Sequence, residues 1–408
     1  MKCRHCHQPL SHTFIDLATA PPSNSYLNEA ELLSPEKWYP LKVLVCDQCW
    51  LVQTQDFVQA DEMFSEDYAY FSSCSSSWLA HAQQYVSQMT ARFALNDNHT
   101  IVEIAANDGY LLQYVKAQQI PCYGIEPTHS TASAAREKGI DIVENFFTVE
   151  LAKQLAEQNR CADLIAANNV LAHVPDINDF TQAFSILLKP NGVATFEFPH
   201  LVNLIEQCQF DTIYHEHYSY LSLTTVNTLF AKNGLSVFDV ETLPSHGGSL
   251  RVFAQRRDSG QHDVQPAVAQ LLNQEKQLGL LDLAYYTKLQ PQAEQKKYDL
   301  LQFLLNIKKD GKKAAAYGAA AKGNTMLNFT GIRNDLIPYV VDRNPAKQGQ
   351  YLPGSRIAIV DENHLKLDRP DYVILIPWNL KQELIEQLSY IREWGGKFVV
   401  YMPELETL

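Results

Sequence analysis

A dense set of proton-transfer groups lies near the middle of the 408-residue chain. Two imidazoles, a carboxylate and two phenols occupy positions 214–218 in the order Tyr-His-Glu-His-Tyr. Side chains of these types act as general acids and bases when they lie within hydrogen-bond reach of a substrate. We therefore expect acid–base chemistry here. A set of packed, hydrogen-bonded aromatic side chains is the structural alternative.

The same five residues also allow a metal-site hypothesis. On a strand, His215 and His217 would share a face, and their imidazoles could converge on one ion beside Glu216. A third ligand is missing nearby in the sequence, which favours the general-base interpretation.

Two pairs of cysteines predict a zinc site at the N-terminus. Each C-x-x-C pair can place two thiolates on one ion, and four thiolates close a tetrahedral site with no open position. The metal is therefore expected to be structural. A redox pair or a chance spacing is the alternative, and His5, His7 and His12 are possible substitute ligands. The expected ligands are Cys3, Cys6, Cys46 and Cys49.

Apolar runs alternate with helical patterns over residues 99–257, which predicts an α/β fold with a parallel sheet. Ser222 is expected to cap a helix that stops at Gly234. Ligands of such sheets bind at the carboxyl ends of the strands. The expected strands cover 100–105, 122–125, 140–143, 163–167 and 192–198, with an antiparallel edge pair at 237–240 and 250–254.

Polar residues follow the first two expected strands. Asn107 and Gly109 lie in a turn into a helix, where a ligand can approach the backbone, and Glu126 is placed to bind a ribose diol. The motif G-x-G-x-x-G is absent, which argues against NAD and leaves an adenosyl ligand such as S-adenosylmethionine (SAM). A seven-stranded sheet with an antiparallel edge favours a class I methyltransferase over a dehydrogenase. A doubly wound domain without a nucleotide is the alternative. The expected cofactor-binding residues are Glu103, Ala105, Asn107, Gly109, Glu126, Asn168 and Asn169.

The chain is long enough for several domains. Within the last of these, the loop 318–325 leads into a helix N-terminus, where Lys322 adds positive charge, and such a place binds anions well. A tight turn that only packs the helix is the alternative. We expect a zinc-binding module at 1–75, a SAM-binding methyltransferase domain at 76–257, a helical bridge at 258–310 and a Rossmann-like substrate-binding domain at 311–408.

The composition and charge of the chain limit the binding partners that we expect. A formal net charge of −13 argues against nucleic acid or an anionic membrane as the main partner. The chain opens without an apolar signal region, and no apolar run approaches the roughly 18 residues of a membrane span. We expect a cytoplasmic protein, as a monomer or homodimer.

The chain resembles the sugar C-methyltransferases of deoxysugar biosynthesis, over its whole length. The resemblance is carried by the paired C-x-x-C module, by the cluster at 214–218, and by segments at 102–112, 124–127, 246–251 and 317–323. It implies SAM as methyl donor and, as substrate, a 4-keto-6-deoxy sugar linked to a nucleotide diphosphate. Methylation at C3 is implied, with C5 as the alternative. A catalytically degenerate zinc-bearing scaffold is the other alternative, because Ala105 and Asn107 depart from the usual glycines of the cofactor loop.

The resemblance also implies a mechanism. A base removes the proton next to the ketone, donors hold the enolate oxygen, and the carbanion attacks the methyl group. His217 corresponds to the base. The other implied catalytic residues are Tyr214, Glu216, His173 and Tyr68, with Tyr70 nearly as good a match as Tyr68. The implied substrate-binding residues are Tyr70, His246, Arg251, Gly318, Lys322 and Asn324.

Overall fold

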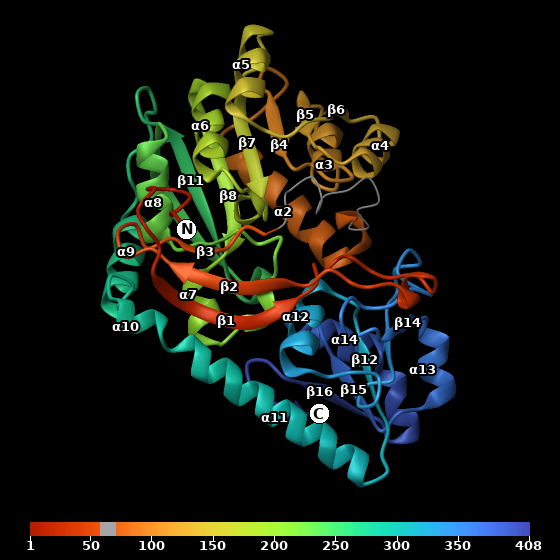
Figure 1. Cartoon of the computed structure of the whole chain (residues 1–408). Helices are drawn as coiled ribbons and strands as arrows, with labels where there is room; N and C mark the ends of the chain where they lie inside the picture. Colours follow the sequence, from red (N-terminus) through yellow and green to blue (C-terminus); the bar gives the residue numbers. More distant parts are fainter. Residues whose placement is uncertain (58–70) are drawn as a thin grey trace.

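The computed structural model of the protein describes residues 1–57 and 71–408. Tyr68 and Tyr70 lie outside the described residues. Within the described part, the strands form sheets of four, seven and six strands. The four-stranded sheet lies between the two larger sheets, and the long helix α11 (Leu289–Lys309) runs along the lower side of the molecule (Figure 1).

The seven-stranded sheet has the strand order β10-β11-β8-β7-β4-β5-β6. Strands β4 to β8 are parallel to their neighbours among themselves, whereas β11 is antiparallel to both β8 and β10. The expected parallel sheet with an antiparallel edge pair is thereby confirmed. The bounds are β4 Ile101–Ile104, β5 Cys122–Ile125, β6 Asp141–Val143, β7 Ala162–Asn168, β8 Leu188–Pro199, β10 Leu235–Leu243 and β11 Ser249–Arg256.

Helices connect these strands, and polar caps fix where several of them begin. The Ser222 side chain accepts a hydrogen bond from the Thr225 amide, as expected of an N-cap, and Gly234 follows the end of the same helix with a φ of +83°. Thr148 and Asp176 cap two further helices in the same way. The bounds are α2 Ser76–Arg92, α3 Leu112–Ala117, α4 His129–Glu137, α5 Val149–Glu157, α6 Ile177–Leu187, α7 Leu201–Glu206 and α8 Leu223–Lys232.

The four-stranded sheet has the order β1-β2-β3-β9, and its last strand comes from a distant part of the chain. Strand β9 (Ser219–Tyr220) pairs with β3 (Val52–Thr54), antiparallel. The 214–218 cluster therefore runs directly into the N-terminal sheet. A two-residue strand has no readable periodicity, so the sequence did not predict it. The other two strands are β1 His12–Ala20 and β2 Tyr39–Val45.

The six-stranded sheet has the order β14-β13-β12-β15-β16-β17, in which only β17 is antiparallel to its neighbour. Strand β14 begins only at residue 358, because Arg356 takes a left-handed φ of +55° that strands do not adopt. The strands are β12 Ala314–Tyr317, β13 Tyr339–Val341, β14 Ala358–Val360, β15 Tyr372–Leu375, β16 Lys397–Val400 and β17 Glu406–Thr407. The helices of this half are α9 Pro266–Leu278, α10 Leu283–Tyr286, α11, α12 Ala321–Thr330, α13 Glu362–Asp368 and α14 Lys381–Gln387.

One hydrophobic core joins the N-terminal sheet to the C-terminal sheet. Phe14 and Leu17 of β1 belong to the same buried cluster as Leu300 of α11 and Met326 of α12. A second core fills the seven-stranded sheet and includes Cys3, Cys46 and Cys49. The N-terminal module is therefore packed against both larger units.

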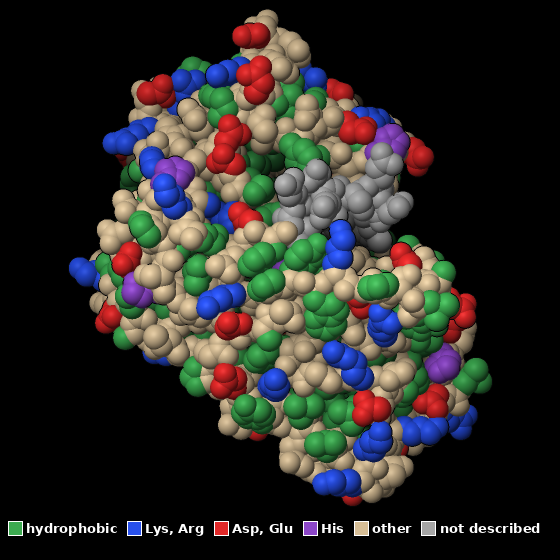
Figure 2. Space-filling model, viewed as in Figure 1, with side chains coloured by type: hydrophobic (Ala, Val, Ile, Leu, Met, Phe, Trp, Pro, Cys, Tyr) green, Lys and Arg blue, Asp and Glu red, His purple; other side chains and the backbone are tan. Residues whose placement is uncertain are grey.

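The surface mixes charges of both signs. On the face shown in Figure 2, basic and acidic side chains are interspersed, so the net charge of −13 is not gathered into one patch there. Among the described residues, no helix has the length and apolar character needed to cross a membrane.

Candidate active site

The 214–218 cluster lies between a short 3₁₀ helix, η4 (Phe210–Thr212), and strand β9. Its members point to different partners. His217 and Tyr214 lie ring to ring, with centroids 3.9 Å apart, and the ring of His173 meets that of His217 edge-on at 4.6 Å. His173 ends the 3₁₀ helix η3 (Leu171–His173), which follows β7. The structure thus brings together three of the predicted catalytic residues.

The hydrogen bond at Nδ1 fixes the tautomer of the neutral His217 ring. Nδ1 lies 2.7 Å from the carbonyl oxygen of Thr212. A carbonyl can only accept, so Nδ1 carries the proton and a neutral ring leaves a lone pair on Nε2. Burial holds the pKa of His217 well below its ordinary value, and positive charge on His173, His246 or Lys322 lowers it further. His217 is therefore in the base form at neutral pH.

The remaining members of the cluster face the N-terminal module. One carboxylate oxygen of Glu216 accepts a hydrogen bond from the Asn24 amide at 2.6 Å. His215 donates from Nε2 to the Pro40 carbonyl at 3.2 Å, and Tyr218 packs against the Arg4 guanidinium. Because His215 and His217 donate to different carbonyls, they do not converge on an ion. In residues 1–57 and 71–408, the cysteine cluster is the group suited to hold a metal.

Two further titratable side chains, His246 and Lys322, lie close enough to His217 for their charge to lower its pKa. His246, with a left-handed φ of +55°, accepts a hydrogen bond at Nε2 from the Asn169 amide at 3.2 Å. Burial lowers the pKa values of His246 and His173 to about 4 each. Lys322 donates from Nζ to Asn379 Oδ1 at 2.6 Å. Burial lowers the pKa of Lys322 as well.

The predicted cofactor loop keeps the backbone of a glycine-rich turn without its glycines. Ala105 and Asn107 have left-handed φ values of +57° and +49°, a conformation that normally favours glycine. Gly109 has a φ of +73°, and a Cβ there would lie 2.3 Å from Ile140 Cδ1. The Asn107 amide donates to Glu126 Oε2 at 2.9 Å, which joins the carboxyl ends of β4 and β5. The loop thus keeps the backbone conformation of a glycine-rich turn although Ala105 and Asn107 stand where glycines are usual.

Several buried polar atoms around this loop lack hydrogen-bond partners among the described residues. They are the Oδ1 atoms of Asp108, Asn168 and Asn169, which lie beyond the carboxyl end of β4 or at that of β7. Burial raises the pKa of Glu103 well above its usual range. Unpaired buried polar groups are costly, so a ligand with amino and hydroxyl groups fits this place. The residues present suit the adenosyl and amino-acid parts of SAM.

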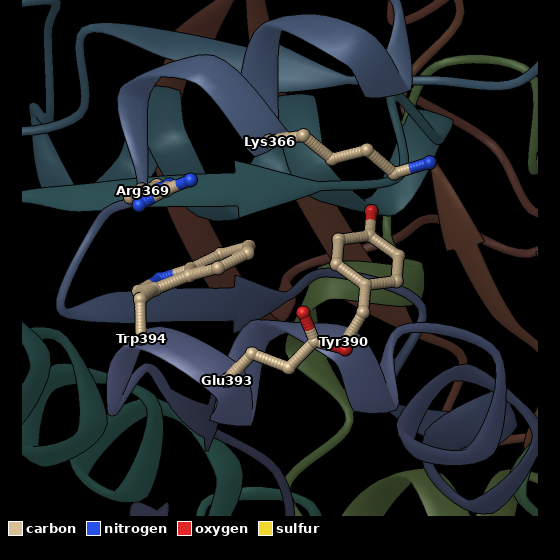
Figure 3. Close-up of a pocket in the computed structure, with 5 residues that line it drawn as sticks. All are labelled: Lys366, Arg369, Tyr390, Glu393 and Trp394. Atoms are coloured by element: carbon tan, nitrogen blue, oxygen red, sulfur yellow. The ribbon is translucent and has the colours of Figure 1, made fainter.

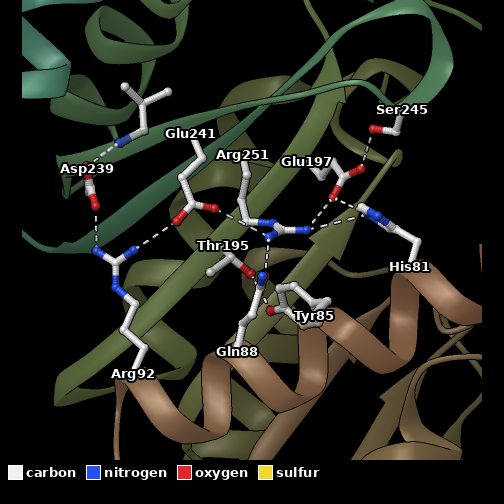
Figure 4. A network of polar contacts seen from close by, with 11 residues as sticks. His81, Tyr85, Gln88, Arg92, Thr195, Glu197, Asp239, Glu241, Ser245 and Arg251 are labelled. Carbon is white, nitrogen blue, oxygen red and sulfur yellow. Dashed lines mark hydrogen bonds and ion pairs between the residues drawn. The ribbon is translucent and has the colours of Figure 1, made fainter.

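Arg251 does not join the histidines. Its side chain is 2% exposed and its guanidinium donates to Glu197 Oε2 at 2.9 Å, under helix α2 (Figure 4). The other oxygen of Glu197 accepts from Ser245 Oγ at 2.8 Å, next to His246. Burial raises the pKa of Glu197, but contacts with His81, Arg251 and Ser245 outweigh it and lower the pKa overall. Arg251 is thus connected to the His246 loop through Glu197.

The three predicted substrate residues of the C-terminal loop have different surroundings. Gly318 has a φ of +92°, and a Cβ would lie 2.5 Å from Pro377. Asn324 is buried and donates to the Ser23 carbonyl of the N-terminal module. Of the three, Lys322 is the one near the histidines, with its Nζ 4.8 Å from the centre of the Trp378 ring.

The four paired cysteines form a compact sulfur cluster. Their Sγ atoms all lie within 4.8 Å of one another, with Cys3–Cys49 at 3.5 Å and Cys6–Cys46 at 3.4 Å. Gln53 Nε2 donates to the Cys3 sulfur at 3.2 Å. Four converging thiols with an outer donor match a closed structural zinc site, so zinc is confirmed as a cofactor.

Sequence reasoning missed the residues that hold the cluster in place. Thr212, Asp211 and Trp378 carry no motif, and Asn24 lies in a loop 192 positions from its partner Glu216. The one available signal was Asp211 itself, an acidic residue three positions before the cluster.

A separate hollow of the C-terminal unit holds none of these residues. It is lined by two cations, one carboxylate and two aromatic rings (Figure 3). The hollow lies near the amino ends of β15 and β16, whereas Lys322 follows the carboxyl end of β12. The lining residues are Lys366, Arg369, Tyr390, Glu393 and Trp394.

The strand order, the loop after β4 and the acidic end of β5 define a class I SAM-dependent methyltransferase. Comparison with known families agrees: a C-methyltransferase C-terminal domain matches residues 244–403, a zinc binding domain matches 3–64, and a methyltransferase domain matches 78–240. The C-methyltransferase NovU of Streptomyces niveus is 33% identical over 403 residues, which cover 99% of this chain and 96% of that protein. The chain belongs to this C-methyltransferase family, which confirms the resemblance seen in its motifs.

Solved structures were also compared. The PH0226 protein of Pyrococcus horikoshii is 12% identical, with 50% of this chain and 100% of that chain covered and a TM-score of 0.38. The magnesium protoporphyrin IX methyltransferase of Synechocystis PCC 6803, with bound SAM, is 13% identical, with 44% and 79% covered and a TM-score of 0.34. At these TM-scores neither carries an argument about this chain.

Proposed function

We propose that the protein transfers a methyl group from SAM to the carbon next to the ketone of a 4-keto-6-deoxy sugar linked to a nucleotide diphosphate. The observation that carries the proposal is the His217 ring, whose Nδ1–H is held by the Thr212 carbonyl so that Nε2 is free to take a proton. The relative NovU, a C-methyltransferase of similar length, supports the reaction class. C3 is the carbon proposed, and C5 is the alternative.

In the proposed reaction, His217 Nε2 removes the proton from the carbon, and the electron pair moves toward the ketone oxygen. The enolate oxygen needs donors, and the side chains around His217 that offer them are Tyr214 and Lys322. The low pKa of His217 suits a base that must stay neutral until it accepts the substrate proton. The His173 ring packs edge-on against the ring of His217.

SAM supplies an electrophilic methyl group when it is bound. The residues proposed to hold it are Glu126, Asn107, Asn168 and Asn169, and the carbanion formed by His217 lies on the side of the sheet where these strands end. Two further residues are proposed to support the cofactor loop: Glu103, which is buried, and Gly109, which packs closely against its neighbours. Tyr68 is proposed to act as a catalytic residue and Tyr70 to bind the sugar, as the resemblance implies.

The C-terminal unit is proposed to bind the nucleotide sugar through Lys322, at the N-terminus of α12. Gly318 and Asn324 are proposed to shape that loop, and Glu216 to fix the N-terminal module beside it. Arg251 is proposed to act through Glu197 on the His246 loop. The scaffold alternative is disfavoured because Ala105 and Asn107 retain the left-handed backbone that a cofactor loop needs.

The test incubates the enzyme with candidate keto sugars in heavy water, without SAM, and follows deuterium uptake by NMR. We expect uptake at a single carbon, C3 for the main proposal or C5 for the alternative. His217→Gln should lower the exchange rate at least 100-fold, which is the smaller end of what a general base contributes. His129→Gln, a change at an exposed histidine of α4, is the matched control. Exchange at the wild-type rate in His217→Gln would show that another group is the base.

A further inference from the structure

The turn η4 precedes the catalytic cluster, but its anchors come from the C-terminal unit. The Asp211 carboxylate is fully buried, and its Oδ2 accepts hydrogen bonds from the Trp378 indole N–H at 2.7 Å and from the Tyr401 hydroxyl at 2.8 Å. Trp378 begins the 3₁₀ helix η6 (Trp378–Leu380), and Tyr401 follows β16 directly. Hydrogen bonds to a carboxylate are among the stronger ones in proteins, so the contact holds the backbone of η4 firmly.

The other end of the same turn is held as well. The Ile213 carbonyl accepts a hydrogen bond from Thr325 Oγ1 of helix α12 at 2.7 Å. The Phe210 ring meets Phe329 of the same helix edge-on, with centroids 5.4 Å apart. The C-terminal unit therefore contacts residues on both sides of Thr212.

Thr212 carries the carbonyl that receives the Nδ1–H of His217. If this carbonyl turned away, the ring could place its proton on Nε2 instead, and that nitrogen could no longer act as a base. A small rotation of the 210–213 backbone is enough to break a 2.7 Å hydrogen bond. The residues that anchor η4 are thus connected to the proposed base through the Thr212 carbonyl.

We propose that Asp211, Trp378, Tyr401 and Thr325 are positioning residues, through which the C-terminal unit holds the Thr212 carbonyl and so sets the tautomer and direction of the base. This proposal rests on the proposed function, because it assumes that His217 is the base. It gives the C-terminal unit a role in the proton transfer beyond holding the substrate.

Trp378 adds a link to the substrate loop. Lys322 Nζ lies 4.8 Å from the centre of the Trp378 ring, and Gly247, next to His246, lies so close to the indole that a Cβ would be 2.6 Å from it. One side chain therefore contacts the proposed anion-binding lysine, the His246 loop and the carboxylate that anchors η4.

The test uses near-isosteric variants that each remove one donor: Tyr401→Phe and Thr325→Val. The first readout is the ¹⁵N NMR spectrum of histidine-labelled free enzyme, with the His217 signals identified by their absence from His217→Gln. We expect the proton on Nδ1 in the wild type and a mixture of tautomers in the variants. The second readout is steady-state kinetics, in which each variant should lower kcat about tenfold, the value of one hydrogen bond, with KM for the sugar changed less than about twofold.

Matched controls make the same chemical changes elsewhere in the C-terminal unit. Thr330→Val removes a hydroxyl that donates within helix α12, and Tyr339→Phe removes one that donates to Asp368. Both should leave the His217 tautomer and kcat unchanged. A similar loss of kcat in controls and test variants would mean general destabilisation and would overturn the proposal.

The outcomes also separate this proposal from the proposed function. If no sugar is methylated, the function fails, but the ¹⁵N spectra still test the anchoring of His217 in the free enzyme. If the variants keep the wild-type tautomer, or raise KM with kcat unchanged, the positioning role is wrong even when the enzyme is active.

Discussion

Replacement of Arg251 by methionine tests what this buried arginine does. In the structure its guanidinium lies 2.9 Å from Glu197, a carboxylate that is 0% exposed, and both are covered by α2 (Figure 4). Arg251→Met keeps much of the length and apolar volume but removes the charge. It leaves Glu197 buried with His81 and Ser245 as its remaining partners.

The expected cost follows from the burial. Removing one partner of a buried ion pair costs about 3–5 kcal/mol, because the remaining charge keeps its desolvation penalty without its attraction. Neutralising that charge as well, in Arg251→Met/Glu197→Gln, should recover part of the loss. We therefore expect the double variant to be at least as stable as Arg251→Met alone.

Urea unfolding followed by tryptophan fluorescence measures these free energies. The matched control is Arg136→Met on helix α4, where the arginine is 40% exposed and pairs with Glu144, which is 31% exposed. An exposed pair of this kind should cost no more than about 1 kcal/mol. Wild-type stability of Arg251→Met, combined with a raised KM for the sugar, would refute the buried-pair reasoning and restore Arg251 as a direct substrate ligand.

Four other changes have clear expected outcomes. Removing zinc with a chelator should lower the melting temperature in calorimetry, whereas replacing it with cadmium should leave kcat unchanged, because the site has no open position. Glu275→Ala should lower the free energy of unfolding in urea by about 3 kcal/mol, because this buried carboxylate accepts from the first two amides of α8. The pKa values of His173 and His246 are about 4, below the 6.5 of the unfolded chain. As the pH falls, the unfolded chain therefore takes up these two protons at a higher pH than the folded protein does. Stability should therefore be full above pH 6.5 and fall toward pH 4, by about 3 kcal/mol per histidine, as urea unfolding at several pH values would show. Gly109→Ala should weaken SAM binding in calorimetric titration and lower stability, because a Cβ there meets Ile140 at 2.3 Å in a left-handed backbone; unchanged affinity would contradict this.

Local pattern was sufficient to predict the central sheet and the zinc ligands. Alternating apolar runs marked strands β4 to β8, and the polar residues after them, such as Asn107 and Glu126, do lie at neighbouring strand ends. The C-x-x-C spacing identified four cysteines whose sulfurs converge. These features depend on residues close together in the chain, where periodicity and spacing carry the information.

Contacts between distant segments could not be predicted in this way. Asp211 meets Trp378 across 167 positions, and Glu216 meets Asn24 across 192. A single tryptophan or asparagine shows no pattern that names its partner. The burial of Arg251 was also hidden, because an arginine in a strand of alternating character is usually expected to face solvent.

The shared core of the N-terminal and C-terminal sheets limits how the chain can be recombined. Phe14 and Val399 belong to one buried cluster although they lie near opposite ends of the sequence, and β9 ties the 214–218 cluster to the same assembly. A chimaera that takes only the C-terminal part of a relative would pair two core surfaces that did not evolve together. Exchange of the proposed sugar-binding parts between relatives therefore requires both ends of the chain to be transplanted as one unit, with the segment proposed to bind the cofactor left in place between them.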